Sequence, residues 1–158
     1  MKTIIIYSTK YGSVEKAAQK LKAHLQGEVD IKNVKMVSDI ANYDKVILAG
    51  SIYAGRIQKE MKTFLKNNLP QLLEKKVGLF ICAGNEKADE IHNLLSQNFT
   101  PPLVEWAIDK ANLGYEYDLK RFSFIDRLAV RIVGGVKESK SKFYEERIKE
   151  FASKINNV

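Results

Sequence analysis

Hydrophobic and polar positions along the chain fall into blocks that predict strands and helices in turn. Four apolar runs have the length of strands, at 3–7, 29–34, 45–49 and 77–82. The third and fourth are continuous apolar runs bounded by charged residues and glycine, which is typical of strands buried on both faces. These runs therefore predict a buried parallel sheet.

Helical periodicity fills the intervals between the strands, because apolar residues recur there every three or four positions. The segments with this pattern are 14–25, 58–73, 88–99 and 141–155. We expect Pro70 to interrupt the second helix and Pro101-Pro102 to end the third. Strands and helices that alternate in this way predict an α/β fold with helices on both faces of the sheet.

One segment, 118–136, breaks this rhythm. It follows a fifth strand expected within 111–117 and stands where a short connection to the last helix would suffice. Residues 122–133 have helical periodicity, and Gly134-Gly135 is a natural stop. The expected apolar face consists of Phe122, Ile125, Ala129, Ile132 and Val133, and the basic face of Lys120, Arg127 and Arg131. We therefore expect a single domain, 1–158, with an extra basic, amphipathic segment.

Composition and charge narrow the class of protein. With 158 residues, 45% hydrophobic and 28% charged, the chain suits one soluble globular domain. Residues 119–158 carry ten Lys/Arg and five Asp/Glu, so +5 of the net charge of +7 lies there. This basic region could attract nucleic acid, an anionic lipid surface or an acidic small molecule, or be a solvated face. Nucleic acid is the least supported, since aromatic residues are not interleaved with the basic ones.

Cysteine content and hydropathy bear on location. Cys82 is the one cysteine, so no internal disulfide can form, which suits a reducing cytosol. The run 4–6 is too short for a signal peptide, and no window reaches the length of a membrane span. We expect a cytoplasmic protein.

Three loops follow strands at the edge where open parallel sheets bind ligands. The first, 8–13, is rich in hydroxyl groups, contains Gly12 and leads into a helix. Free backbone N–H groups and the helix dipole make such a turn suitable for a phosphate. The alternative is that Ser13 only caps the helix.

The second and third loops are suited to a flat ligand. Gly50 and Gly55 allow close approach of the backbone, and Tyr53 could stack on a ring or simply cover the sheet edge. Gly84 and Asn85 offer backbone N–H groups, a weak signal when taken alone. Three such loops on one edge are a stronger signal than any one of them.

Several other sites are excluded by missing residues. The spacing of Gly50 and Gly55 fits a nucleotide P-loop, but Arg56-Ile57 replaces the required Lys-Ser/Thr. There is no G-x-G-x-x-G motif, no G-x-S-x-G elbow, and no acidic pair after the first strand as in receiver domains. Two isolated histidines make a zinc site improbable, and Cys82 suits inert packing.

The three loops together resemble the flavin site of the flavodoxin-like family. Residues 7–13 look like its FMN phosphate loop, T/S-x-T-G-x-T, with Tyr11 at a position often occupied by a hydroxyl residue. Residues 50–55 look like the loop beside the isoalloxazine ring, and 82–85 like the loop on the ring's other side. The resemblance implies a flavodoxin-like three-layer sandwich with a five-stranded parallel sheet of order 2-1-3-4-5, binding FMN non-covalently.

The same resemblance implies the cofactor-binding residues, in three groups. They are Ser8, Thr9, Lys10, Gly12 and Ser13 at the phosphate, Ser51, Tyr53, Ala54 and Gly55 on one side of the ring, and Ala83, Gly84 and Asn85 on the other. No catalytic side chain and no metal are expected, because the flavin carries the chemistry.

A narrower similarity links the chain to the menaquinone-dependent protoporphyrinogen oxidase branch of this family. It rests on residues 6–12 and 50–56 and on the basic segment before the last helix. The branch implies two-electron oxidation of a reduced substrate, with protoporphyrinogen IX as one candidate and a quinone as acceptor. Lys10 and Arg56 near the ring would favour an anionic hydroquinone.

Two questions stay open from the sequence. The amphipathic helix could lie on the inner face of the membrane through residues 120–133, or pack its apolar side on the sheet edge. The protein could also be an electron carrier of the flavodoxin type, which docks to redox partners instead of oxidising a small molecule.

Overall fold

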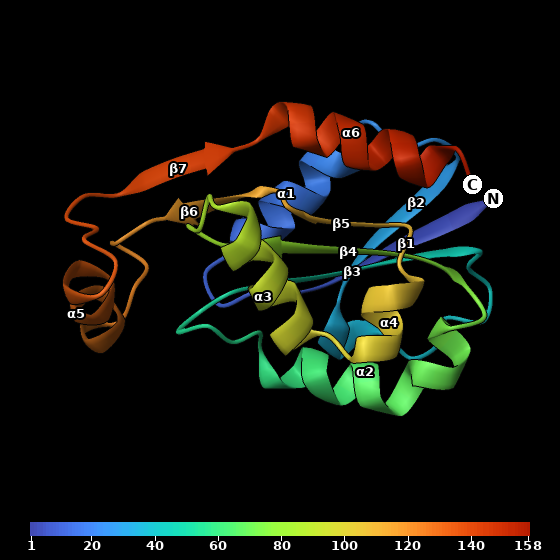
Figure 1. Cartoon of the computed structure of the whole chain (residues 1–158), viewed down its shortest axis with the longest axis horizontal. Coiled ribbons are helices and arrows are strands. Elements are labelled where there is room, and N and C mark those ends of the chain that lie inside the picture. The colour runs from blue at the N-terminus through green and yellow to red at the C-terminus, as the bar shows by residue number, and fades with distance from the viewer.

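A five-stranded parallel sheet forms the centre of the protein (Figure 1). The computed structural model describes all 158 residues. The strands are β1 (Lys2–Ser8), β2 (Glu28–Asn33), β3 (Lys45–Ser51), β4 (Lys76–Cys82) and β5 (Asp109–Asn112). They lie in the order β2-β1-β3-β4-β5 and are parallel throughout. The predicted fold class and strand order are confirmed.

Helices cover both faces of this sheet, in three layers (Figure 1). One face carries α1 (Ser13–Lys22) and α6 (Glu145–Asn156), and the other α2 (Lys59–Leu72), α3 (Ala88–Asn98), α4 (Pro101–Trp106) and the short 3-10 helix η1 (Val34–Met36). Side chains alternate along each strand, so that Ile4 and Ile6 face one layer and Ile5 the other. Since both faces are covered, β1, β3 and β4 are buried along nearly their whole length, which explains their continuous apolar runs.

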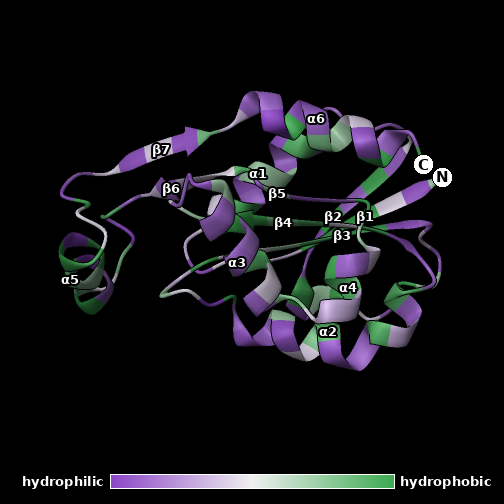
Figure 2. Cartoon of the chain, viewed as in Figure 1, coloured by the Kyte–Doolittle hydropathy of each residue, from purple (hydrophilic) through white to green (hydrophobic).

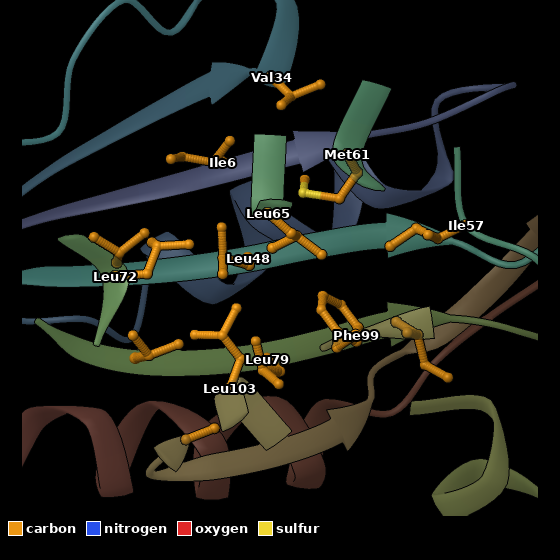
Figure 3. Packing of buried hydrophobic residues seen from close by; sticks show 14 of the residues in the cluster. Ile6, Val34, Leu48, Ile57, Met61, Leu65, Leu72, Leu79, Phe99 and Leu103 are labelled. Carbon is orange, nitrogen blue, oxygen red and sulfur yellow. The ribbon is translucent and has the colours of Figure 1, made fainter. Parts of the chain in front are cut away.

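The core beneath α2 and α4 holds the sheet and the helices together (Figure 3). Leu48 of β3 and Leu79 of β4 pack there with Met61 and Leu65 of α2 and with Leu103 of α4. Each of these side chains is at most 1% exposed. Full burial of such a side chain stabilises the fold by about 1.5–3 kcal/mol. The strand ends that bear the loops are therefore anchored in a rigid core.

Proline has a different effect on the helices from the one expected. Pro70 does not interrupt α2, which continues to Leu72, because a proline in the last turn removes only one hydrogen bond near the helix end. The Pro101-Pro102 pair follows α3 as predicted, but it also begins α4, since proline is favourable in the first turn of a helix. That short helix was not foreseen.

The prediction of one strand within 111–117 is wrong, because this region contains two strands of different sheets. β5 ends at Asn112, and β6 (Gly114–Tyr117) pairs antiparallel with β7 (Lys140–Phe143). Gly114 makes the turn with φ 125, a conformation that favours glycine. The last helix accordingly begins at Glu145 instead of 141, because the preceding residues belong to β7.

Residues 118–136, which we call the insert, lie between β6 and β7 at one end of the molecule (Figure 1). They contain α5 (Phe124–Ile132), so the predicted helix is present. Its N-cap is Ser123, whose Oγ accepts a hydrogen bond of 3.1 Å from the Asp126 N–H.

The orientation of α5 contradicts one of the two alternatives left open by the sequence, that its apolar side packs on the sheet edge. Phe124, Ile125 and Ile132 are 79%, 76% and 73% exposed, and Leu128 and Val133 are exposed as well. In Figure 2 much of the α5 ribbon, at one end of the molecule, has the colour of hydrophobic residues. Phe122, placed on the same face by the sequence, instead precedes the helix and is buried. None of the helices combines the length and apolar character needed to cross a bilayer.

Candidate functional site

The loops after β1, β3 and β4 meet at the carboxyl edge of the sheet, as predicted. β3 lies between the other two strands. At this edge Ser8 pairs with Gly50, and Ser51 pairs with Cys82. The order of the strands reverses between β1 and β3, which is where open α/β sheets bind ligands.

The loop after β1 forms an anion cradle at the start of α1. Gly12 is the N-cap with φ 94, and its N–H donates to Thr9 Oγ1 at 2.9 Å. Ser13 is the first helical residue and makes no capping bond, so it is not the helix cap. Six backbone N–H groups of this loop and of the first turn of α1 donate to no acceptor in the protein, those of Thr9, Lys10, Tyr11, Ser13, Val14 and Glu15. Free N–H groups at a helix N-terminus are suited to a phosphate.

Gln58, the N-cap residue of α2, braces the first loop against the second. Its Oε1 accepts from Ser8 Oγ at 2.8 Å, and its Nε2 donates to Ser51 Oγ at 2.8 Å and to the Ser51 carbonyl at 3.0 Å. The hydroxyl groups of Ser8 and Ser51 are therefore engaged within the protein. No sequence motif pointed to Gln58, because a single glutamine has no characteristic spacing.

The second loop is a tight turn held from α3. Tyr53 and Arg56 exchange two backbone hydrogen bonds of 3.0 Å, with Ala54 (φ 49) and Gly55 (φ 75) between them. The Asn98 amide donates to the Gly55 carbonyl at 3.0 Å and accepts from the N–H of residue 57 at 2.8 Å. These bonds hold the backbone of the turn in one conformation. The side chain of Arg56 is exposed, and it does not line the cavity or the narrow hollow in which we place the site below.

Asn112, at the end of β5, holds the third loop. It is 1% exposed, and its Nδ2 donates to the carbonyls of Ala83 and Asn85 at 2.8 Å each. Its Oδ1 accepts from the Ala83 N–H at 3.2 Å. A Cβ at Gly84 would collide with the Tyr117 hydroxyl, so only glycine allows this close approach. Asn112 and Tyr117 were both missed from the sequence.

A cavity of about 410 Å³ lies between the second loop, the third loop and the insert. Its walls include Tyr53, Ala54, Gly55, Gly84, Asn85, Tyr115, Tyr117, Ala129 and Val130. Its volume and mainly apolar, aromatic lining are those of a small-molecule site. A larger hollow of about 600 Å³ between η1 and α2 has no wall from the three loops, and we place the site in the smaller cavity for that reason.

A second, narrow hollow of about 40 Å³ lies toward the phosphate loop and shares Tyr53 and Tyr117 with the cavity. Its lining includes four further predicted site residues, Lys10, Ser13, Ser51 and Ala83. The structure thus brings nine of the predicted residues to these two adjoining hollows. Ser8 and Thr9 face another hollow of about 360 Å³ beside β2, which Lys10 also lines.

Asp126 of α5 enters the junction between the first two loops. Its carboxylate accepts from Lys10 Nζ at 2.6 Å and from the hydroxyls of Tyr11 and Tyr53. Lys10 Nζ also lies 3.9 Å from the centroid of the Tyr53 ring, a cation–π contact. The charge of Lys10, expected to act on the flavin, is paired with this carboxylate.

The ionisation of this cluster follows from burial and hydrogen bonding. Burial by itself would raise the pKa of Asp126, but the hydrogen bonds from Lys10, Tyr11 and Tyr53 outweigh it and hold that pKa well below its usual range. Burial and the bond to Asp126 raise the pKa of Tyr53 to about 12. Burial also raises the pKa of the Cys82 thiol, as suits an inert residue. At neutral pH Asp126 is therefore charged and Tyr53 protonated.

Comparison with known proteins agrees with this geometry. A family model described as a flavodoxin domain matches residues 4–143. The oxidised flavodoxin 1 of Bacillus cereus has a TM-score of 0.56 at 12% identity, with 98% of this chain and 97% of that one covered. The Fusobacterium nucleatum flavodoxin bound to flavin mononucleotide has a TM-score of 0.56 at 16% identity, with 99% and 97% covered. No curated protein matches the chain in sequence.

Part of a larger enzyme is also similar. Rubredoxin oxygen:oxidoreductase from Desulfovibrio gigas has a TM-score of 0.53 at 16% identity over 99% of this chain, which spans 35% of that protein. At such identities the solved structures show a shared fold alone. The family model, however, matches continuously from β1 to the end of β7 and includes all three loops. The chain therefore belongs to the flavodoxin domain family.

Proposed function

We propose that this protein is an oxidoreductase that holds FMN non-covalently at the carboxyl edge of its sheet. The observation that carries the proposal is the free N–H cradle at α1 next to an apolar cavity between two rigid loops. A phosphate fits the first, and a flat aromatic ring fits the second. Two solved structures of similar fold are described with FMN, the Fusobacterium nucleatum flavodoxin and a Lactobacillus acidophilus flavoprotein.

The residues of the chain have distinct tasks in this proposal. The backbone of Lys10 and Ser13 binds the phosphate, and the Thr9 hydroxyl fixes the turn at Gly12. The turn at Tyr53 and the loop at Gly84 enclose the ring and exclude water. FMN itself supplies hydride and electron transfer when bound. No side chain of the protein is required as a nucleophile.

For the substrate we propose a reduced, anionic molecule, with protoporphyrinogen IX as the candidate that the sequence resemblance implies. Lys140 lines the cavity beside α5, and Arg131 and Lys137 lie exposed on the same insert and its border. Such side chains bind carboxylates, which a porphyrinogen carries. Each turnover would remove two electrons and two protons from the substrate and pass them to a quinone, forming the quinol.

We also propose a cytoplasmic location with peripheral contact at the inner face of the membrane. The support is the exposed apolar side of α5 around Ile125 and Ile132, together with Lys120 and Arg131 on the same segment, 120–133. A helix that is apolar on one side and basic beside it is suited to an anionic lipid surface, where quinone is dissolved.

The test of the cofactor proposal is direct. Purified protein should be yellow, or become so when incubated with FMN, and should quench the fluorescence of added FMN. A protein that stays colourless and leaves FMN fluorescence unchanged would refute the proposal. Turnover of protoporphyrinogen IX with a quinone, monitored by porphyrin fluorescence, then tests the substrate.

A second candidate is an electron carrier of the flavodoxin type. It is favoured by the comparisons, since the chain covers 97% of the length of each of two flavodoxins of similar fold. Redox titration separates the two functions. A stable one-electron semiquinone with widely split potentials indicates the carrier, and direct two-electron reduction indicates the oxidase.

A further inference from the structure

The helix α5 is attached to the rest of the protein through a charged residue. Asp126 is the one buried residue of α5 and the only buried carboxylate of the chain. A buried carboxylate is stable only when its lost hydration is replaced by hydrogen bonds and a counter-charge. All three donors to Asp126 come from the two loops of the proposed flavin site, at Lys10, Tyr11 and Tyr53. The position of α5 and the positions of these side chains therefore depend on one another.

Two neighbours of Asp126 strengthen the attachment to the phosphate loop. The Phe122 ring stacks on Tyr11, with centroids 4.2 Å apart and planes 21° from parallel. Arg121 Nη1 donates to the Tyr11 carbonyl at 3.3 Å. The same Nη1 atom would lie 3.2 Å from a Cβ placed at Gly12. The insert thus lies directly against the anion cradle.

The same attachment makes α5 a wall of the cofactor cavity. Ala129 and Val130 line the cavity opposite the loops at Tyr53 and Gly84. Beyond α5 the chain continues through Gly134-Gly135, with φ 63 at Gly135, and returns along β7. Figure 1 shows α5 at the tip of this arm, away from the helices that cover the sheet.

We propose that Asp126 is a positioning residue that closes α5 over the cofactor cavity and fixes Lys10 and Tyr53 at its entrance. The closure is a property of the protein alone. Its effect on a flavin rests on the function proposed above. The experiments below therefore address the protein with and without flavin.

The first experiment measures opening of the insert without flavin. Trypsin cleaves after Arg127 and Arg131, and peptide mass spectrometry follows these two sites. Asp126→Ala should accelerate their cleavage about 10- to 100-fold, because several hydrogen bonds to one charged group are lost. Glu138→Gln is the control: it removes an exposed carboxylate two residues beyond the insert that forms no ion pair or hydrogen bond, and it should be cleaved like the wild type. Asp126→Glu, which keeps the charge, should restore most of the protection.

A second variant tests the same contact in case Asp126→Ala does not fold correctly. Tyr53→Phe removes one donor from the opposite side of the contact and leaves α5 unchanged. It should accelerate cleavage about tenfold, as expected for one hydrogen bond to a charged group. Equal cleavage of the wild type, Asp126→Ala and Tyr53→Phe would overturn the proposal.

The second experiment measures binding of FMN and of riboflavin, which lacks the phosphate, by fluorescence quenching. Asp126→Ala should lower the affinity for both flavins about tenfold, because the cavity loses a wall. Weakening of FMN alone would overturn the closure, because Asp126 would then act on the phosphate end. If the wild type binds neither flavin, the proposed function fails, and the cleavage result still decides the closure.

Discussion

The helices α5 and α6 are both amphipathic, but they turn opposite sides toward the protein. α6 buries Ile148, Phe151 and Ile155 on the sheet. α5 buries Asp126 and exposes Ile125 among several large apolar residues. Periodicity predicts that a helix has an apolar side, but the surface available to the helix decides where that side points.

The surfaces that receive the two helices explain the difference. α6 lies on the apolar face of the sheet, where Gly78 of β4 leaves room: a Cβ there would come within 2.8 Å of both Phe151 and Ile155. α5 projects beyond the sheet on the β6–β7 pair and meets loops that carry Lys10 and Tyr53. Only a polar anchor can satisfy those groups.

The largest expected effect compares one phenylalanine from each helix. Phe151→Ala in α6 should lower the free energy of unfolding by about 3–5 kcal/mol, because it opens a cavity in the core. Phe124→Ala in α5 should change it by less than about 0.5 kcal/mol, since that side chain is 79% exposed. Urea denaturation measures both. Similar losses in the two variants would show that α5 is packed and would break the comparison.

The next effect tests what the exposed side of α5 contacts. Replacing Ile125 and Ile132 together by serine should weaken binding to vesicles of anionic lipid by about 2–4 kcal/mol, from the apolar area no longer buried. Met36→Ser is the control, because Met36 is 75% exposed but far from α5 in sequence, after β2. Flotation of the proteins with anionic and with neutral vesicles gives the measurement. Wild-type protein that floats with neither kind of vesicle would contradict the membrane proposal.

Much of the fold could be predicted from the sequence, because the central strands are surrounded by apolar side chains on both faces. β1, β3 and β4 are buried on both faces, so their central residues are apolar and the strands were found with small errors at the ends. The three loops were found because they follow those strands. The pairing of Gly114–Tyr117 with Lys140–Phe143 was not, since it joins segments on either side of the insert.

The candidate site divides in a similar way. The N–H cradle at Gly12 could be predicted, because glycine and hydroxyl residues before a helix are a local signal. Asp126, Gln58 and Asn112 could not, because each acts through partners distant in the sequence. Single side chains that hold loops in place form no sequence motif by which they could be recognised.

Titration of Tyr53 measures the anchor of α5 in isolation. A tyrosine whose pKa is raised contributes stability below its ordinary pKa of 10.0 and loses that contribution as the pH rises through about 12. Asp126 has a lowered pKa, so its contribution is present above its ordinary 3.8 and is lost only as the pH falls well below that value. The anchor should therefore hold from mild acid to pH 10 and open between 10 and about 12.

Tyrosinate absorbance follows this opening, and Tyr53→Phe identifies the group. Asp126→Asn should move the Tyr53 transition down toward 10, because the carboxylate charge no longer opposes tyrosinate formation. If the pKa of Tyr53 stays near 12 in Asp126→Asn, burial alone raises it. The buried end of α5 would then need another explanation.

The smallest expected effect separates the phosphate cradle from α5. Thr9→Val preserves shape but removes the oxygen that accepts the Gly12 N–H at 2.9 Å, which loosens the turn without touching Asp126. FMN affinity should fall by about 0.5–1.5 kcal/mol, the usual value of one hydrogen bond, while riboflavin affinity stays unchanged. Thr63→Val on the exposed side of α2 is the control. Because Asp126→Ala should weaken both flavins, the two variants assign phosphate and ring to different parts of the site, and a Thr9→Val variant that weakens riboflavin equally would show that cradle and cavity act as one unit.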